Sequence, residues 1–335
     1  MPSLFPTLPL SLGGLTEICG GLSFLEMTKH RFASHVCETL LLQAAASVVA
    51  REIDGGGSAQ EEGAEGEVPF ATMEALFLHV FHQILPHLGD LITHTFASHT
   101  VRTLILLLAG RPASSAAAVL HSRKKEGLSS VAAPGEVAVP QSFRGAVAQV
   151  LGFVGENFST DQLRALAVDR IASPALQIIL QIEMALPKKD RRRRAKEGCL
   201  LLDRLMGTTT KGDGEGDSKG DDRGDDGGGD DEGRGFFQNL LYDPVGSHLA
   251  ESLIRVAPKK DFDMLYTRFI RARLASLARN ETAAFVVQRV LEKLSGVWLQ
   301  EAGNEVLAQV PGLVGLALLP SSLAVGRPLA ANGLM

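Results

Sequence analysis

Aromatic residues are scarce in this chain of 335 residues, at 5%, although hydrophobic residues reach 45% and leucine is abundant. Few rings and many leucines favour stacked helices over a β-sandwich. Cysteine is scarce too, and Cys19, Cys37 and Cys199 form neither a CxxC pair nor an even set. Such a pattern is typical of a protein kept in a reducing compartment. The composition therefore predicts an all-α protein without disulfides.

Signatures of catalysis are missing as well. No GxxxxGK(S/T), GxGxxG or GxSxG motif stands on a strand–turn–helix background, and the glycine runs are typical of loops. His79, His82 and His87 lie near His94 and His99, but no third ligand follows at a zinc-binding spacing and no HExxH is present. We therefore expect no enzyme, no cofactor, no metal site and no small-molecule substrate.

Membrane and secretion signals are also lacking. No apolar run reaches the length of a membrane span. Residues 1–26 contain no Lys or Arg, whereas a signal peptide begins with a basic stretch. We expect no membrane association, and we interpret residues 1–26 as a non-repeat leader that is disordered or follows a mis-assigned start.

Three segments interrupt the apolar helical pattern. They are rich in Gly, Ala, Ser or Asp, and they span residues 54–68, 112–140 and 207–234. Such segments cannot offset the entropy of ordering, so we expect disordered insertions. The stretch 213–232 has a net charge of −8, and because the whole chain carries −5, the remainder is +3. A mildly basic body is compatible with a phosphate-binding surface, although the margin is small.

One motif returns along the chain. The twelve residues HRFASHVCETLL from His30 match HTFASHTVRTLI from His94 at seven positions. Looser copies begin at Asp169, Asp243 and Asn280. Repetition on this scale is typical of a solenoid, in which each unit buries its apolar face against its neighbours.

Each copy also predicts a helix start, because a polar residue precedes two small residues and then an apolar run of helical period. Pro174 fits a first-turn position, where a missing N–H has no intrahelical partner. Further helices are expected over 71–85, 142–157 and 160–168. The fold class is therefore an all-α curved solenoid of five repeats over residues 27–297, with the motif helices side by side on the concave face and a partial helix and flexible tail over 298–335.

Polar side chains recur on one face of each motif helix. Residues four apart lie one turn apart on the same face. The pairs are Ser34 with Glu38, Ser98 with Arg102, Ser173 with Gln177, Ser247 with Glu251, and Ala284 with Gln288. The residue after the first member of each pair is His35, His99, Pro174, His248 or Phe285. Four of the five copies therefore offer a flat ring beside the pair.

This pattern resembles pumilio-type RNA-binding repeats. The segments FASHVCETLL, THTFASHTVRTL, ASPALQIILQIE, DPVGSHLAE and NETAAFVVQRVL are similar to the nucleolar protein 9 branch of that family, in order, from about residue 27 to 294. The resemblance implies a nucleolar protein that binds small-subunit precursor rRNA, single-stranded or structured, and supports maturation of the 18S species beside other proteins of the pre-ribosomal particle. Members of that family continue with further repeats, so we expect a partial chain.

The resemblance also implies roles for the side chains. In pumilio repeats the pair grips one base edge while the ring stacks between bases. The implied RNA-binding residues are Ser34, His35, Glu38, Ser98, His99, Arg102, Ser173, Gln177, Ser247, His248, Glu251, Phe285 and Gln288. The pairs Ser34–Glu38 and Ser247–Glu251 match guanine readers in that scheme. Ser173–Gln177 is closer to an adenine reader, and Ser98–Arg102 suits the acceptor edge of cytosine. Pro174 and Ala284 depart from the pattern.

Alternatives remain at this stage. A helical scaffold of the HEAT or armadillo type, binding protein segments in its groove, would share the leucine pattern but would not need a polar pair beside a ring in each repeat. His35, His99 and His248 also fit helix-terminal residues that face solvent. The basic run at residues 187–196, PKKDRRRRAK, fits an RNA phosphate contact, a nuclear-import signal or a solvated, flexible loop.

Overall fold

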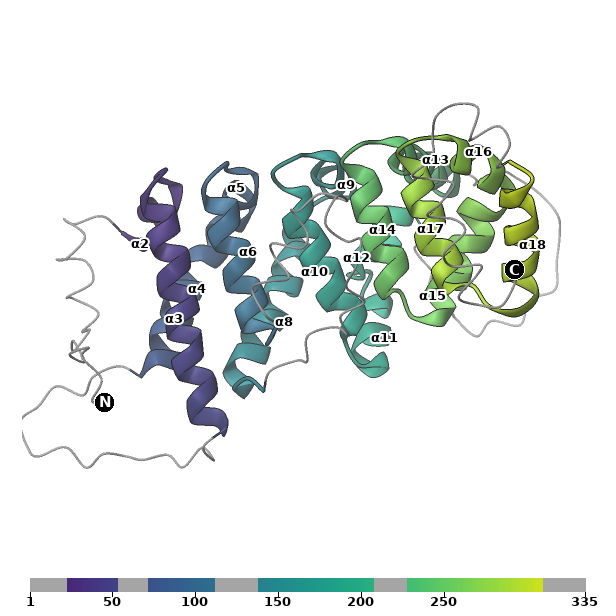
Figure 1. Cartoon of the computed structure of the whole chain (residues 1–335). Coiled ribbons are helices and arrows are strands. Elements are labelled where there is room, and N and C mark those ends of the chain that lie inside the picture. Colours follow the sequence, from purple (N-terminus) through teal and green to yellow (C-terminus); the bar gives the residue numbers. More distant parts are fainter. Residues whose placement is uncertain (1–22, 54–71, 112–137, 208–227, 310–335) are drawn as a thin grey trace, which may run out of the picture. The chain divides into compact units, whose positions relative to one another are not determined.

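The structure is a computed structural model that describes residues 23–53, 72–111, 138–207 and 228–309 (Figure 1). Every regular element within these ranges is a helix, which confirms the all-α repeat solenoid. The chain divides into two compact units between Phe153 and Val154, inside α8 (Gln141–Asn157). The leader up to residue 22, the predicted tail from residue 310 and most of the three predicted insertions lie outside the described residues.

Unit 1 contains the first two copies of the motif. Its helices are α2 (Phe24–Lys29), α3 (Ala33–Ile53), α4 (Met73–Ile84), the 3-10 turn η1 (Leu85–His87), α5 (Leu88–Thr93), α6 (Ala97–Leu108) and the first part of α8. The motif helices α3 and α6 pack against each other. The helix expected over 71–85 corresponds to α4 and η1.

The turn before each motif helix in unit 1 is built on a histidine. Nδ1 of His94 accepts hydrogen bonds from the backbone N–H groups of Phe96 and Ala97 at 3.2 and 3.3 Å. Nδ1 of His30 accepts from Phe32 and Ala33, both at 3.3 Å. Both histidines have extended backbone, as an N-cap does. The sequence predicts a helix start here, and the ring nitrogen provides the acceptor that the first turn lacks.

Unit 2 contains the other three copies of the motif. Its helices are the rest of α8, then α9 (Thr160–Val168), α10 (Ser173–Ala185), α11 (Lys188–Lys196), α12 (Leu201–Met206), α13 (Gly228–Tyr242), α14 (Gly246–Val256), α15 (Lys259–Leu265), the π-helical turn η2 (Tyr266–Ile270), the 3-10 turn η3 (Arg271–Arg273), α16 (Leu274–Arg279), α17 (Ala283–Lys293) and α18 (Gly296–Leu307). The motif helices α10, α14 and α17 pack as successive neighbours (Figure 1).

The same turn recurs in unit 2 with an oxygen as the acceptor. Oδ1 of Asp243 accepts from the N–H groups of Val245 and Gly246 at 2.8 and 2.6 Å. Asp169 and Asn280 make the equivalent pairs of bonds at 2.7–2.8 Å and 3.0 Å. The next residues must be small because the motif helix starts close to the preceding helix. A Cβ on Gly246 would lie 2.5 Å from a side-chain carbon of Leu240.

Two boundaries differ from those expected. Ser23 and Glu26 form a reciprocal capping box at the start of α2, so the first helix begins inside the range interpreted as a leader. At the other boundary, α13 begins at Gly228, inside the insertion expected over 207–234. A Cβ on Gly233 would lie 2.2 Å from the carbonyl oxygen of Met206. This glycine permits a close helix contact, whereas the composition alone suggests a loop.

The basic run is a helix, which corrects its interpretation as a flexible loop. Seven of the nine residues of α11 are Lys or Arg. Like charges one turn apart repel, and an isolated helix of this length is unstable in water. Contacts with the rest of unit 2 must therefore hold α11 in place.

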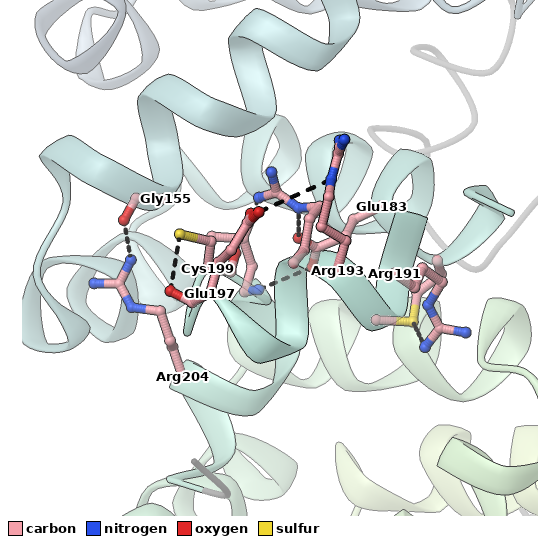
Figure 2. A network of polar contacts seen from close by, with 10 residues as sticks. Gly155, Glu183, Arg191, Arg193, Glu197, Cys199 and Arg204 are labelled. Carbon is pink, nitrogen blue, oxygen red and sulfur yellow. Dashed lines mark hydrogen bonds and ion pairs between the residues drawn. The ribbon is translucent and has the colours of Figure 1, made fainter. Parts of the chain in front are cut away.

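A buried ion pair makes the main contact (Figure 2). Glu183, near the end of α10, is 0% exposed, and its Oε1 accepts from Nε of Arg194 at 3.1 Å. The other carboxylate oxygen accepts from the backbone N–H of Leu201 at 2.9 Å. Nη2 of Arg194 donates to the carbonyl of Cys199, also at 2.9 Å. The ion pair thus joins α10, α11 and the start of α12.

One bent pair of helices has the length and composition of a membrane span. In the ranges given above, no single helix is both long and apolar enough to cross a bilayer, and α9 with α10 passes only as a pair bent by 118°.

Candidate nucleic-acid interface

The first member of each predicted pair is buried. Ser34, Ser98, Ser173, Ser247 and Ala284 are between 0 and 4% exposed. The hydroxyl of Ser34 donates to the carbonyl of Arg31 at 3.3 Å, and the hydroxyl of Ser173 accepts from Nε2 of Gln177 at the same distance. In the described structure these small residues therefore support the first turn, and the ring and the second pair member form the outer part of the site.

The rings divide by repeat. His35 and His99 are exposed, and the side chain of His248 is 43% exposed. Phe285 is half-buried, whereas Pro174 is buried. Four repeats thus bring a flat ring to or near the surface in the same register, and the third does not.

In unit 1 the second members form a polar cluster with a threonine. Oε1 of Glu38 in α3 accepts from the hydroxyl of Thr103 in α6 at 2.9 Å. Thr100, one turn earlier, donates to the carbonyl of Ser34 at 3.3 Å. The carboxylate of the first repeat is therefore held by the second repeat, with its other oxygen available for a further donor.

Arg102 lies inward in the same cluster. It is 2% exposed, its Nε donates to the Ser98 carbonyl at 3.2 Å, and its Nη2 lies 2.8 Å from Nδ1 of His99. Its Nη1 has no hydrogen-bond partner among the described residues. Burial lowers the pKa of Arg102, and burial followed by the adjacent guanidinium lowers the pKa of His99. The imidazole is thus favoured in its neutral form, and Nδ1 is the acceptor because the guanidinium has only donors.

In unit 2 the equivalent carboxylate lies between a histidine ring and an arginine. Oε1 of Glu251 lies 3.9 Å from Nδ1 of His248 on its own helix, and Oε2 lies 3.9 Å from Nε of Arg289 on α17. Arg289 also pairs with Glu292 at 3.0 Å, and Glu292 accepts from Gln288 at 3.1 Å. The fourth and fifth repeats therefore share one charged network on the side of the predicted pairs.

The third motif helix is more enclosed. Gln177 is 5% exposed and bonds to Ser173 within its own pair. One turn on, Nε2 of Gln181 donates to the hydroxyl of Ser252 in α14 at 2.7 Å. The Gln181 bond ties α10 to α14, and the Gln177 bond stays within α10.

Two residues of the site, Thr103 and Arg289, were not predicted. Each follows the second pair member of its repeat and contacts the carboxylate of the preceding repeat. The sequence holds a signal for them, since this position is polar in four copies, as Thr39, Thr103, Ser252 and Arg289, and apolar only at Ile178.

The described histidines outside the motifs, His79, His82 and His87, do not belong to a metal-binding group. His79 contacts Gln83 at 3.0 Å, and the part of the chain that the structure describes contains no group of three His, Cys, Asp or Glu side chains placed to hold a metal ion.

The sequence matches a repeat-domain family over most of its length. The NOP9-like PUF repeat domain aligns with residues 15–322, which extends the resemblance beyond residues 27–294 and into the leader. A nucleolar protein 9 from Arthroderma benhamiae is 36% identical over 327 residues, covering 91% of this chain and 43% of the relative. The Aspergillus clavatus protein of the same name is 37% identical over 303 residues, covering 87% and 41%. The chain thus spans less than half the length of these relatives.

Solved structures share the fold. APUM23 solved with the sequence GGAAUUGACGG aligns with a TM-score of 0.58 and 18% identity, covering 91% of this chain and 49% of that chain. APUM23 with GGAGUUGACGG aligns with a TM-score of 0.56 and 18% identity, covering the same shares.

Proposed function

This chain belongs to the nucleolar protein 9 family of PUF-repeat proteins, and on that premise we propose that it binds small-subunit precursor rRNA and supports maturation of the 18S species. The nucleolus is the compartment of this family, as the name of its members states. The family is a repeat-domain family and not an enzyme class. Partners in this proposal are the precursor RNA, single-stranded or structured, and proteins of the pre-ribosomal small-subunit particle.

The observation that carries the proposal is the common register of ring and polar side chain on successive motif helices. His248 and Glu251 occupy one turn of α14, and Phe285 and Gln288 occupy the same turn of its neighbour α17. Proteins read single-stranded RNA by stacking unpaired bases on flat side chains and by bonding to their Watson–Crick edges. Four of the five motif helices supply a ring, and three of these also supply a polar group that is not buried, which are the two parts that this reading needs.

Within the proposal, the thirteen predicted residues take two roles. The exposed or half-exposed rings and Glu38, Glu251 and Gln288 would contact bases directly, with Glu38 and Glu251 accepting from the two N–H donors on the edge of guanine. The four serines, Arg102 and Gln177 are buried and would act by supporting that surface. Recognition would thus combine base contacts at some repeats with backbone contacts elsewhere.

A titration of the full chain against structured and unstructured precursor-rRNA segments tests the proposal. Saturable binding is expected, and His248→Ala should weaken it by an amount near the roughly 1–3 kcal/mol of a stacked base. His82→Ala is the matched control, because it removes an exposed ring from α4, outside the motifs. If no RNA segment binds saturably, the proposal is contradicted, and a scaffold for protein segments would give that result. If both variants lose the same affinity, the assigned surface is wrong.

A further inference from the structure

The cations of α11 divide between an inner and an outer face. Arg194 bonds to Glu183 and Cys199, as described above. Arg191 pairs with Asp261 at the start of α15, and its guanidinium also contacts the sulfur of Met184 at 3.5 Å (Figure 2). These two arginines fix the helix on unit 2 and join α11 to α15.

The outer face carries the other five cations. All five are exposed, and they are Lys188, Lys189, Arg192, Arg193 and Lys196. Their spacing places 188, 192 and 196 in one row and 189 and 193 in the adjacent row of the same helix face. One ion pair on this face is Arg193 with Glu197 at 4.0 Å. Both of its side chains are more than half exposed, so solvent screens the pair.

The neighbouring helix repeats the arrangement. Both α11 and α15 open with Pro-Lys-Lys-Asp, at residues 187–190 and 258–261. Lys259 and Lys260 are exposed, as are Lys188 and Lys189. Figure 1 places the two helices at one edge of unit 2, where α10 and α14 end. Seven exposed cations therefore gather on two helices that are held together by an ion pair.

Stability does not explain these lysines. The N-terminus of a helix carries a partial positive charge, so basic residues in the first turn oppose it. The sequence nevertheless places two lysines there in both helices. The exposed face of α11 has no ring for base stacking, and the aromatic residue of α15, Phe262, is only 3% exposed. The exposed surface of these two helices therefore offers positive charge to a partner but no side chain that could stack on a base.

We propose that the outer faces of α11 and α15, here called the basic edge, bind the phosphate backbone of RNA. This inference rests on the proposed function, and it adds a second surface that recognises charge and not sequence. Gln177 and the end of α10 are eight residues apart, about 12 Å along the helix. The basic edge would therefore hold a part of the RNA that flanks the bases read by the motif helices.

Charge-neutral variants of the full chain test the basic edge. Lys188→Gln, Arg192→Gln and Lys196→Gln together remove one row, and Gln keeps the helix propensity. The control removes three exposed cations elsewhere in unit 2 by Arg271→Gln, Arg273→Gln and Arg279→Gln. Arg271 and Arg279 also bond to Glu301 and Gln309, so the helix content of this variant is checked too. The measurement is the slope of log K against log salt for two single-stranded RNAs of unrelated sequence, with circular dichroism to verify helix content.

The row variant should reduce the salt slope by about 2, because each lost phosphate contact removes about 0.7 for a single strand. The reduction should be equal for both RNAs, while the control keeps the wild-type slope.

If the row and control variants have the same salt slope while His248→Ala still weakens binding, the proposed role of the basic edge is wrong and the proposed function stands. If the row variant keeps its RNA affinity but no longer accumulates in the nucleolus of cells, α11 is an import signal and the inference is overturned. Absence of any RNA binding by the wild type overturns both proposals.

Discussion

The two units build the same turn from different chemistry. In unit 1 an imidazole nitrogen accepts the two backbone N–H groups, at 3.2–3.3 Å, whereas in unit 2 a carboxylate or amide oxygen accepts them at 2.6–3.0 Å. The residue before each motif helix thus needs a side-chain acceptor that reaches the two N–H groups, and several residue types can provide it. Asp169 and Asp243 add a negative charge at a helix N-terminus, which the helix dipole favours, and a neutral imidazole does not.

The units also differ in how the side chain of a buried arginine is bonded. Arg194 in unit 2 meets a buried carboxylate at 3.1 Å, whereas Arg102 in unit 1 bonds to a backbone carbonyl and an imidazole and leaves Nη1 without a partner in the described ranges. Removing one partner of a buried ion pair leaves an uncompensated charge, but removing an incompletely bonded group relieves a desolvation penalty. The same substitution should therefore have different consequences in the two units.

The largest effect is expected from Arg194→Met, which should lower the free energy of unfolding by about 3–5 kcal/mol. Arg102→Met should change it by less than about 1 kcal/mol, because Met fills similar space and no buried carboxylate loses a bonded partner. Denaturant unfolding of the full chain at pH 8 compares the two variants. If both variants lose the same free energy of unfolding, the presence of a buried carboxylate partner makes no difference and the prediction is wrong.

The pH dependence of unit 2 should come partly from Glu183. Burial raises the pKa of this carboxyl from its ordinary 4.5 to about 7, against the attraction of Arg194 and the backbone donors of Leu201 and Leu202. The native state therefore binds the proton more tightly than the unfolded chain. This contribution is fully present below pH 4.5 and declines as pH rises toward 7, by about 3 kcal/mol in total.

Glu183→Gln is the comparison variant, because an amide does not titrate in this range. At pH 4.5 the native wild type holds Glu183 protonated, so neither protein then gives Arg194 a charged counter-ion and their stabilities should be close. The informative quantity is the wild-type free energy of unfolding minus that of Glu183→Gln, measured from pH 4.5 to 8. That difference should fall as pH rises, and a constant difference would mean that Glu183 does not titrate there.

The two carboxylates of the proposed guanine readers offer a third comparison. Glu38 accepts from the Thr103 hydroxyl at 2.9 Å, whereas Glu251 lies 3.9 Å from the His248 ring and from the Arg289 guanidinium. Glu251→Gln should reduce the preference for guanine at one position by about 1–3 kcal/mol, the scale of a bidentate base contact. Glu38→Gln should have a smaller effect, because Thr103 already occupies part of that carboxylate. RNAs that differ at a single guanine provide the measurement, and an unchanged preference in both variants would mean that these helices do not read bases.

The sequence predicted the elements that depend on local chemistry. The helices expected over 142–157 and 160–168 became α8 and α9 with nearly the same bounds, because Pro140 and Ser159 mark their starts and the apolar period continues between them. All five motif helices begin where a polar acceptor precedes small residues. These signals lie within a few residues of the structure that they specify.

Features that depend on distant residues were not predictable in this way. The helix α11 forms because Glu183 and Asp261 lie in other helices, which a run of basic residues does not reveal. Likewise, periodicity placed the five pairs on one face but could not tell that the first member of each pair would be buried, since that depends on how closely the neighbouring helices approach. The roles of the pairs in RNA binding stay predictions.

The smallest effect, and the sharpest comparison between the units, should come from exchanging the acceptors of the turn. Asp243→Ala removes the acceptor for two N–H groups and should lower the free energy of unfolding by about 1 kcal/mol, the usual value for a lost N-cap. Asp243→Asn keeps an oxygen in place and should lower it by only a few tenths.

In unit 1, His94→Ala should lower the free energy of unfolding less than Asp243→Ala does, because its bonds are longer and no charge is lost from the helix terminus. His94→Asp should stabilise unit 1 by up to about 1 kcal/mol if the carboxylate reaches Phe96 and Ala97 as Asp243 reaches Val245 and Gly246. Amide hydrogen exchange at these N–H groups measures each turn separately, and faster exchange at Phe96 and Ala97 in His94→Asp than in the wild type would mean that the unit 1 turn needs the longer imidazole.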